Sequence, residues 1–179
     1  VYMKATGIVR RIDELGRIVI PKEIRKTLRI KDGENLEIYV APDESIILKK
    51  HSLLKKMESF AQDLCDSVYA FIKENIIITD SDKIIAVAGE LKKKLIDQEL
   101  SDEIDSKIIR REEMLEKHIK PLTITNDVSI ECAYAISPVI INGDCQGSVM
   151  IISKNKSIDE TTFKITQIIS EFIKKNIEM

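Results

Sequence analysis

The sequence predicts an α+β protein with two domains, residues 3–51 and residues 52–179. The first observation is a difference in charge between the two parts. Residues 3–50 carry 11 basic and 8 acidic side chains, whereas residues 51–179 carry 17 basic and 22 acidic ones. Short β-branched runs separated by turn residues are the second, and they fill the first domain. The third is a strand meander between helical patterns in the second domain, which predicts an antiparallel sheet with helical layers.

The first domain is predicted to consist of short strands around one short helix. Residues 5–20 indicate a strand, a turn and a strand, with Gly16 supplying a positive φ in the turn. Pro21 suits the start of a helix because its missing N–H is not needed there. The remaining expected elements are a helix over 22–28 and two strands over 36–40 and 46–49.

This first domain is too small to stand alone. Fewer than 50 residues, in four short strands and a two-turn helix, cannot bury enough apolar surface for a stable monomer. We therefore expect it to fold only on association with another chain.

The second domain is predicted to begin with a helix over 53–73, capped by Ser52 and continuous enough to transmit orientation between the domains. A strand pair follows over 75–89. The later elements are helices within 90–117 with a new start at Ser101, strands over 122–125, 130–141 and 148–153, and a last helix opened by the capping-box spacing Ser157 to Glu160.

The last helix has an unusually wide apolar side. Its members are Ile165, Ile168, Ile169, Phe172 and Ile173, with Phe163 before them. They fit a core under the sheet, or a core combined with a seam that joins two dimers as a helical bundle. The sequence leaves both open.

The stretch from Thr6 to Ile30 concentrates positive charge. It holds seven basic residues and three acidic ones, interleaved with aliphatic residues, which indicates a folded basic surface. Compact basic surfaces of this kind usually bind a polyanion, although solvated surface charge is the simpler alternative.

Within this stretch, GIVRRIDELGRIVIPKEIRKTL resembles the N-terminal DNA-binding domain of the AbrB-type transition-state regulators, and the match continues through LEIYV and IILKK to Lys50. The resemblance implies a swapped-hairpin β-barrel dimer that binds double-stranded DNA. The order of elements in 52–179 resembles a GAF domain, a small sensory module. The resemblance therefore implies an AbrB-like N-terminal barrel followed by a GAF-like antiparallel sheet.

The AbrB resemblance also implies a DNA-binding site. Its family contacts fall on Arg10, Arg17, Arg25 and Lys26 of this chain. Lys26 stands where AbrB itself has arginine, which keeps the charge and loses the planar bidentate fork. Arg11 and Lys22 complete the predicted set of DNA-binding residues.

The implied function is a sequence-selective transcription regulator of sporulation-stage genes. A homodimer would form through the first domain and a homotetramer through the second, which would also sense an unidentified small-molecule ligand. An antitoxin that neutralises a toxin and binds its own promoter is the alternative, because swapped-hairpin domains also occur in antitoxins. A patterned domain of more than 100 residues weighs against it.

We expect no catalytic site, metal or cofactor. Cys65, Cys132 and Cys145 are scattered and predict free thiols, while Asp80 and Asp82 fit a strand turn more simply than a cation site. The sequence contains no P-loop, nucleophile elbow or metalloprotease helix. No apolar run approaches the roughly 20 residues that span a bilayer, so we expect a cytoplasmic protein without membrane contact.

Overall fold

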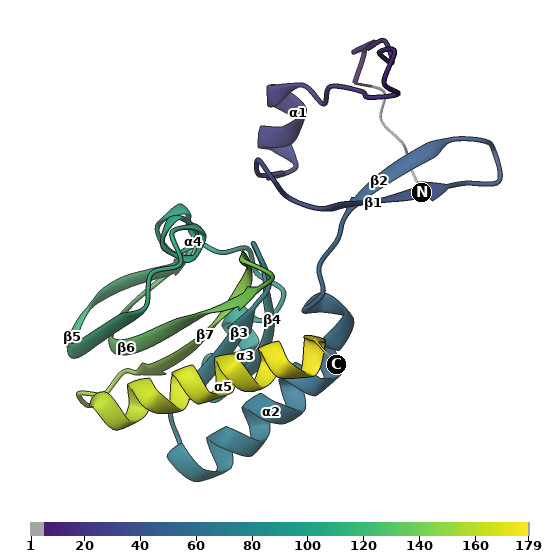
Figure 1. Ribbon diagram of the computed structural model, residues 1–179. Helices are drawn as coiled ribbons and strands as arrows, with labels where there is room; N and C mark the ends of the chain where they lie inside the picture. The colour runs from purple at the N-terminus through teal and green to yellow at the C-terminus, as the bar shows by residue number, and fades with distance from the viewer. Residues whose placement is uncertain (1–5, 179) are drawn as a thin grey trace. The chain divides into compact units, whose positions relative to one another are not determined.

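The chain divides into two compact units, Val1–His51 and Ser52–Met179 (Figure 1). The computed structural model describes residues 6–178, so residues 3–5 of the predicted first domain lie outside the described part.

The described residues of the first unit, 6–51, form one helix and one β-hairpin. Helix α1 spans Lys22–Thr27, and strands β1 (Leu36–Val40) and β2 (Ile46–Lys50) pair antiparallel. The loop is closed by a hydrogen bond of 2.9 Å from the Ala41 N–H to the Ser45 carbonyl. The predicted helix and hairpin are confirmed.

The prediction of two strands within residues 5–20 is wrong for the single chain. Their turn is present, since the Gly16 N–H donates to the Asp13 carbonyl at 2.9 Å and Gly16 has a φ of 75°. The flanking residues 6–12 and 17–20 form no strand. One backbone hydrogen bond joins them near the turn, from the Asp13 N–H to the Arg17 carbonyl at 3.0 Å. Strand propensity needs a neighbouring strand to satisfy the remaining backbone groups.

The first unit has almost no interior. Pro21 is the one buried residue among residues 6–51. Large apolar side chains of this unit are instead exposed: Val9, Ile12, Leu15, Ile18, Val19, Leu28, Ile38, Val40 and Ile46.

The second unit is built on a five-stranded antiparallel sheet in the order β4-β3-β7-β6-β5 (Figure 1). Its strands are β3 (Asn75–Thr79), β4 (Ile84–Ala88), β5 (Met114–Thr125), β6 (Val128–Ile141) and β7 (Asp144–Ser153). Consecutive strands form hairpins in the pairs β3 with β4, β5 with β6, and β6 with β7. Strands β4 and β5 are the two edges of the sheet, and β7 lies beside β3, with Ile77 opposite Met150.

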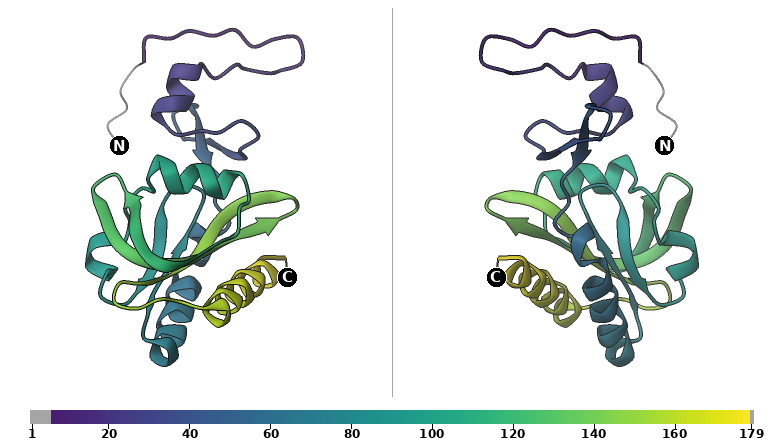
Figure 2. Two further views of the ribbon diagram at one scale, coloured as in Figure 1. Left: turned by 90° about the vertical axis from the view of Figure 1, so that its left-hand side faces the viewer. Right: turned by 90° about the vertical axis from the view of Figure 1, so that its right-hand side faces the viewer.

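Helices cover both faces of this sheet (Figure 2). On one face, α2 (Glu58–Ile72) and α5 (Glu160–Glu178) bury Ala61, Cys65, Ile169 and Ile173 against the strands. On the other face, α3 (Lys92–Leu95) and α4 (Asp102–Ile109) pack over a second apolar cluster. The predicted α+β class with helical layers around an antiparallel sheet is confirmed.

The helix predicted over 53–73 starts later than expected. A 3-10 turn, η1 (Lys55–Met57), precedes α2, and Ser52 Oγ accepts from the Lys55 N–H at 3.1 Å instead of capping a long helix. Leu54 is fully buried against Gly147, where a Cβ would lie 2.7 Å from Leu54 Cδ1 and 2.0 Å from the Thr79 carbonyl oxygen. Packing of Leu54 into the sheet therefore takes precedence over helical continuity.

Residues 90–117 are less helical than the charge pattern predicts. The start of α4 at the Ser101 cap is confirmed, since Ser101 Oγ accepts from the Ile104 N–H at 3.2 Å. Residues 114–117, however, begin β5, and the first three of them pair with β6, so Pro121 lies inside a strand and closes no helix. The last helix is capped by Asp159, whose Oδ1 accepts from the Thr162 N–H at 2.9 Å, not by Ser157.

Candidate nucleic-acid interface

Arg17 is held in place by the turn that precedes it. Asp13 Oδ1 accepts from the Arg17 backbone N–H at 2.8 Å, and Asp13 Oδ2 accepts from Arg17 Nε at 2.7 Å. Hydrogen bonds from the Arg17 backbone and then from its side chain hold the pKa of Asp13 below its ordinary value. Asp13 thus remains charged and orients an arginine that is exposed to solvent.

Arg10 and Arg11 lie on the segment that leads into this turn, and both are exposed. Arg10 Nη1 makes a local contact of 3.3 Å with the Val9 carbonyl. The structure gives Arg11 no carboxylate partner within residues 6–178. Both guanidinium groups remain available to an external anion.

Helix α1 carries the other three predicted residues. Lys22 and Lys26 are exposed, and neither has a carboxylate partner in the described part of the chain. Arg25 is partly buried and forms an ion pair with Asp32. The six predicted residues therefore come from two local structures of one unit, the 13–16 turn with its flanks and helix α1.

Two further basic residues of this unit serve its own structure. Lys50 Nζ donates to the Arg29 carbonyl at 2.6 Å and lies 3.5 Å from Glu34 Oε1. Arg29 itself has a φ of 51°, the left-handed conformation that ends α1. Arg29 belongs to the basic stretch of the sequence, and only the backbone geometry identifies its role in the turn.

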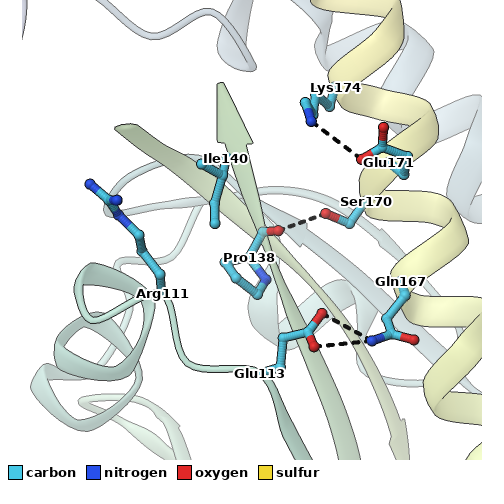
Figure 3. Close-up of a pocket in the computed structure, with 8 residues that line it drawn as sticks. All are labelled: Arg111, Glu113, Pro138, Ile140, Gln167, Ser170, Glu171 and Lys174. Atoms are coloured by element: carbon cyan, nitrogen blue, oxygen red, sulfur yellow. Dashed lines mark hydrogen bonds and ion pairs between the residues drawn. The ribbon is translucent and has the colours of Figure 1, made fainter. Parts of the chain in front are cut away.

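A second candidate site lies in the second unit. A pocket of about 500 Å³ opens between α5, the end of β6 and the segment between α4 and β5 (Figure 3). Its lining consists of Arg111, Glu113, Pro138, Ile140, Gln167, Ser170, Glu171 and Lys174. No sequence motif predicted this pocket, because its residues come from three separate segments.

Other chemistries have less support. Within residues 6–178 no group of three or more His, Cys, Asp or Glu side chains is placed to hold a metal ion. None of the three cysteines forms a disulfide, and burial raises the pKa of Cys65 to about 12 and that of Cys132 to about 11, which makes both poor nucleophiles. No helix in the described residues is long and apolar enough to cross a bilayer.

Known protein families match each unit separately. Residues 56–178 match the family model described as stage V sporulation protein T C-terminal, transcription factor. Residues 9–56 match the model described as antidote-toxin recognition MazE, bacterial antitoxin.

Individual relatives extend these matches. Stage V sporulation protein T of Bacillus subtilis is 39% identical over 98% of this chain and 99% of its own length. Transition state regulatory protein AbrB of the same organism is 64% identical over 50 residues, which are 28% of this chain and 51% of AbrB. The GAF domain of PixJ from Thermosynechococcus elongatus shares the fold, with a TM-score of 0.50, 11% identity and coverage of 69% of this chain and 88% of that one.

An AbrB-like unit joined to a GAF-fold unit defines a class of two-unit transcription factors. Within that class, the full-length match decides the family. The chain belongs to the stage V sporulation protein T family of transcription factors.

Proposed function

We propose that this protein is a sequence-selective DNA-binding regulator of sporulation-stage transcription. The observation that carries the proposal is the set of six basic residues on the 13–16 turn region and α1, in a unit that is 64% identical to AbrB. The members are Arg10, Arg11, Arg17, Lys22, Arg25 and Lys26. In DNA complexes such cations neutralise phosphates, and oriented arginines read base edges.

The DNA-binding form is proposed to be a dimer of the first unit with interleaved hairpins. The exposed apolar side chains at Val9, Ile12, Val19 and Ile38 support this, because a monomer would leave them all in water. Unpaired backbone on both sides of the 13–16 turn supports it too, since a second chain could supply the missing strand neighbours.

The second unit is proposed to join two such dimers into a tetramer and to sense a small ligand. The support for assembly is an exposed apolar strip on α2 and α5, where Phe71 is 87% exposed, Ile168 67% and Phe172 47%. The GAF fold supports sensing by analogy of fold alone.

Salt titration tests the DNA-binding mode. Four family contacts per chain give eight per dimer, so log K should fall against log salt with a slope of roughly −5 to −7. A slope near −1 would contradict an electrostatic interface.

Arg17 variants test its role as an oriented reader of bases. Arg17→Ala removes both the charge and the fork, so it should weaken binding most at the preferred DNA sites and reduce the salt slope by about 1 for each phosphate contact that is lost. Arg17→Lys keeps the charge and loses the fork, so it should keep the slope and relax sequence selectivity. Lys164→Ala, at an exposed position on α5, is the matched control for loss of one positive charge and should bind like the parent.

An antitoxin remains the second candidate because residues 9–56 match the MazE model. The antitoxin hypothesis predicts that the chain binds a toxin more tightly than it binds unrelated DNA. Genome-wide mapping of bound DNA, with Arg17→Ala as the comparison, separates the two. Many Arg17-dependent sites would support the regulator, whereas a single site at the protein's own promoter would favour the antitoxin.

A further inference from the structure

Two carboxylates of the first unit bind arginines of the predicted DNA-binding set, and they do so at different atoms. Asp13 accepts from Arg17 Nε at 2.7 Å, next to the aliphatic stem, which leaves both terminal nitrogens of that guanidinium to donate elsewhere. Asp32 accepts from Arg25 Nη1, which is one of the terminal nitrogens. Asp13 therefore leaves the outer end of its arginine open to DNA, whereas Asp32 covers the outer end of Arg25.

The two carboxylates also differ in what holds them. Asp13 Oδ1 accepts from the Leu15 and Arg17 backbone N–H groups at 3.0 and 2.8 Å, so Asp13 is fixed in the turn and can orient its arginine. The side chain of Asp32 is 92% exposed, and within residues 6–178 it has no hydrogen-bond or ion-pair partner other than Arg25. A carboxylate held by nothing else cannot fix an arginine in one direction.

The end of α1 brings Asp32 back to Arg25. The Ile30 N–H donates to the Arg25 carbonyl at 2.8 Å and the Arg29 N–H donates to the Lys26 carbonyl at 3.2 Å, which are the two hydrogen bonds of a Schellman motif. The left-handed Arg29, with a φ of 51°, reverses the chain at this point. The residues that follow therefore return beside the last turn of the helix, and Asp32 lies within reach of the Arg25 guanidinium.

The pair between Asp32 and Arg25 can open at little cost. Exposed ion pairs contribute little to stability, because water screens both charges and the side chains lose rotational freedom when they pair. The hydrogen bonds of the Schellman motif are made by the backbone and do not depend on the Asp32 carboxylate. A phosphate can therefore take the place of Asp32 on Arg25 without disturbing the turn.

We infer that Asp32 masks Arg25 in the free protein and that a DNA phosphate displaces it on binding. The apparent affinity of a site that is available only part of the time is reduced by the available fraction. Masking thus lowers the affinity of the basic surface for every polyanion. It rests on the proposed DNA-binding function, because it adds an internal competitor to that interface.

Asp32→Asn removes the competitor and keeps the size of the side chain. In the full-length protein it should raise DNA affinity by at least about threefold at about 50 mM salt, since each dimer would regain two arginines. The gain should shrink as salt rises, because salt already screens the exposed pair in the parent. Fluorescence anisotropy with labelled duplex DNA measures the affinity, and circular dichroism checks that the fold is unchanged.

A double-mutant cycle separates masking from a general loss of negative charge. In an Arg25→Ala background, Asp32→Asn should have no more effect than Glu44→Gln has in the parent. Glu44 is exposed in the β1–β2 loop and has no ion-pair partner within residues 6–178, so Glu44→Gln is the matched control for one lost carboxylate.

Masking is excluded if Asp32→Asn gains no more than Glu44→Gln, or if its gain persists with Arg25→Ala. A loss of affinity in Asp32→Asn would mean that Asp32 positions Arg25 instead of masking it. Elution of the same variants from heparin, a sulfated polyanion without base sequence, separates this test from the proposed function. An Arg25-dependent shift of Asp32→Asn to higher salt on heparin, with no binding to duplex DNA, would remove the DNA-binding regulator and leave masking in place.

Discussion

The two units of this chain use their apolar residues in opposite ways. In the second unit, α2 and α5 cover one face of the sheet and α3 and α4 the other, and residues such as Ile77, Leu95 and Met150 are completely buried. In the first unit, Pro21 alone is buried within residues 6–51, and comparable aliphatic residues point to solvent.

This difference separates two sources of stability. The second unit can bury its hydrophobic surface within one chain, so its stability is a property of its own sequence. The first unit has aliphatic side chains of the kind that form a core, but the single chain does not bury them. Its stability therefore has to come from association with another chain.

Separating the units should have the largest effect. Residues 52–179 alone should unfold with a Tm that does not depend on protein concentration. Residues 1–51 alone should fold only as a dimer, with a Tm that falls on dilution. Circular dichroism melts over a hundredfold range of concentration measure both. A compact monomer of residues 1–51 with a constant Tm would remove the contrast.

Truncating one leucine in each unit tests whether the two units differ in their source of stability. Leu54 is fully buried in the second unit, so Leu54→Ala should cost about 2–5 kcal/mol of unfolding free energy at any concentration. Leu28 is the exposed C-cap residue of α1 in the single chain, so its truncation should cost little within a monomer. If the first unit buries its apolar surface on dimerisation, Leu28→Ala should instead weaken the dimer. Chemical denaturation at several protein concentrations distinguishes these results.

The exposed strip on α5 gives a smaller, assembly-specific effect. The sequence places Ile169 and Phe172 on the same apolar side of the last helix, but Ile169 is only 4% exposed and belongs to the core. The pair Ile168→Glu and Phe172→Glu should reduce a tetramer to dimers with the second unit still folded. Light scattering measures the mass. The same mass as the parent, with an unchanged far-ultraviolet spectrum, would exclude this face as the seam.

The smallest effect concerns pH. Burial, assisted by the neighbouring Asp82 charge, raises the pKa of Asp80, although hydrogen bonds from the Asp82 and Lys83 backbone N–H groups oppose it. The stability that protonated Asp80 contributes is fully present below its ordinary pKa and is lost as pH rises through the raised value. Asn can accept the same backbone hydrogen bonds without charge.

Asp80→Asn should therefore gain stability relative to the parent between about pH 4 and pH 7. Urea unfolding at both pH values measures the change. Asp144→Asn, at the exposed first residue of β7, is the control and should show no such trend. An equal effect of Asp80→Asn at both values would mean that burial of the charge is not what perturbs Asp80.

The sequence by itself determined much of this protein. The β-branched runs identified the β1–β2 and β3–β4 hairpins, the Ser101 cap identified the start of α4, and the repeated apolar spacing identified α2 and α5. These features depend on neighbours within a few residues, so local sequence is sufficient to predict them. The six basic residues of the proposed DNA interface were likewise identified from sequence and a family resemblance, and their role stays a prediction.

Tertiary structure decided what depends on distant partners. Residues 6–12 and 17–20 have strand-forming sequence, yet they form no strand in the single chain because strands require a neighbour for their hydrogen bonds. Ile168 and Ile169 are the same residue type side by side, and only the position of α5 against the sheet exposes one and buries the other. Arg111, Pro138 and Lys174 line one pocket because β6 extends beyond the start of β5 beside α5. No local sequence pattern encodes this strand register.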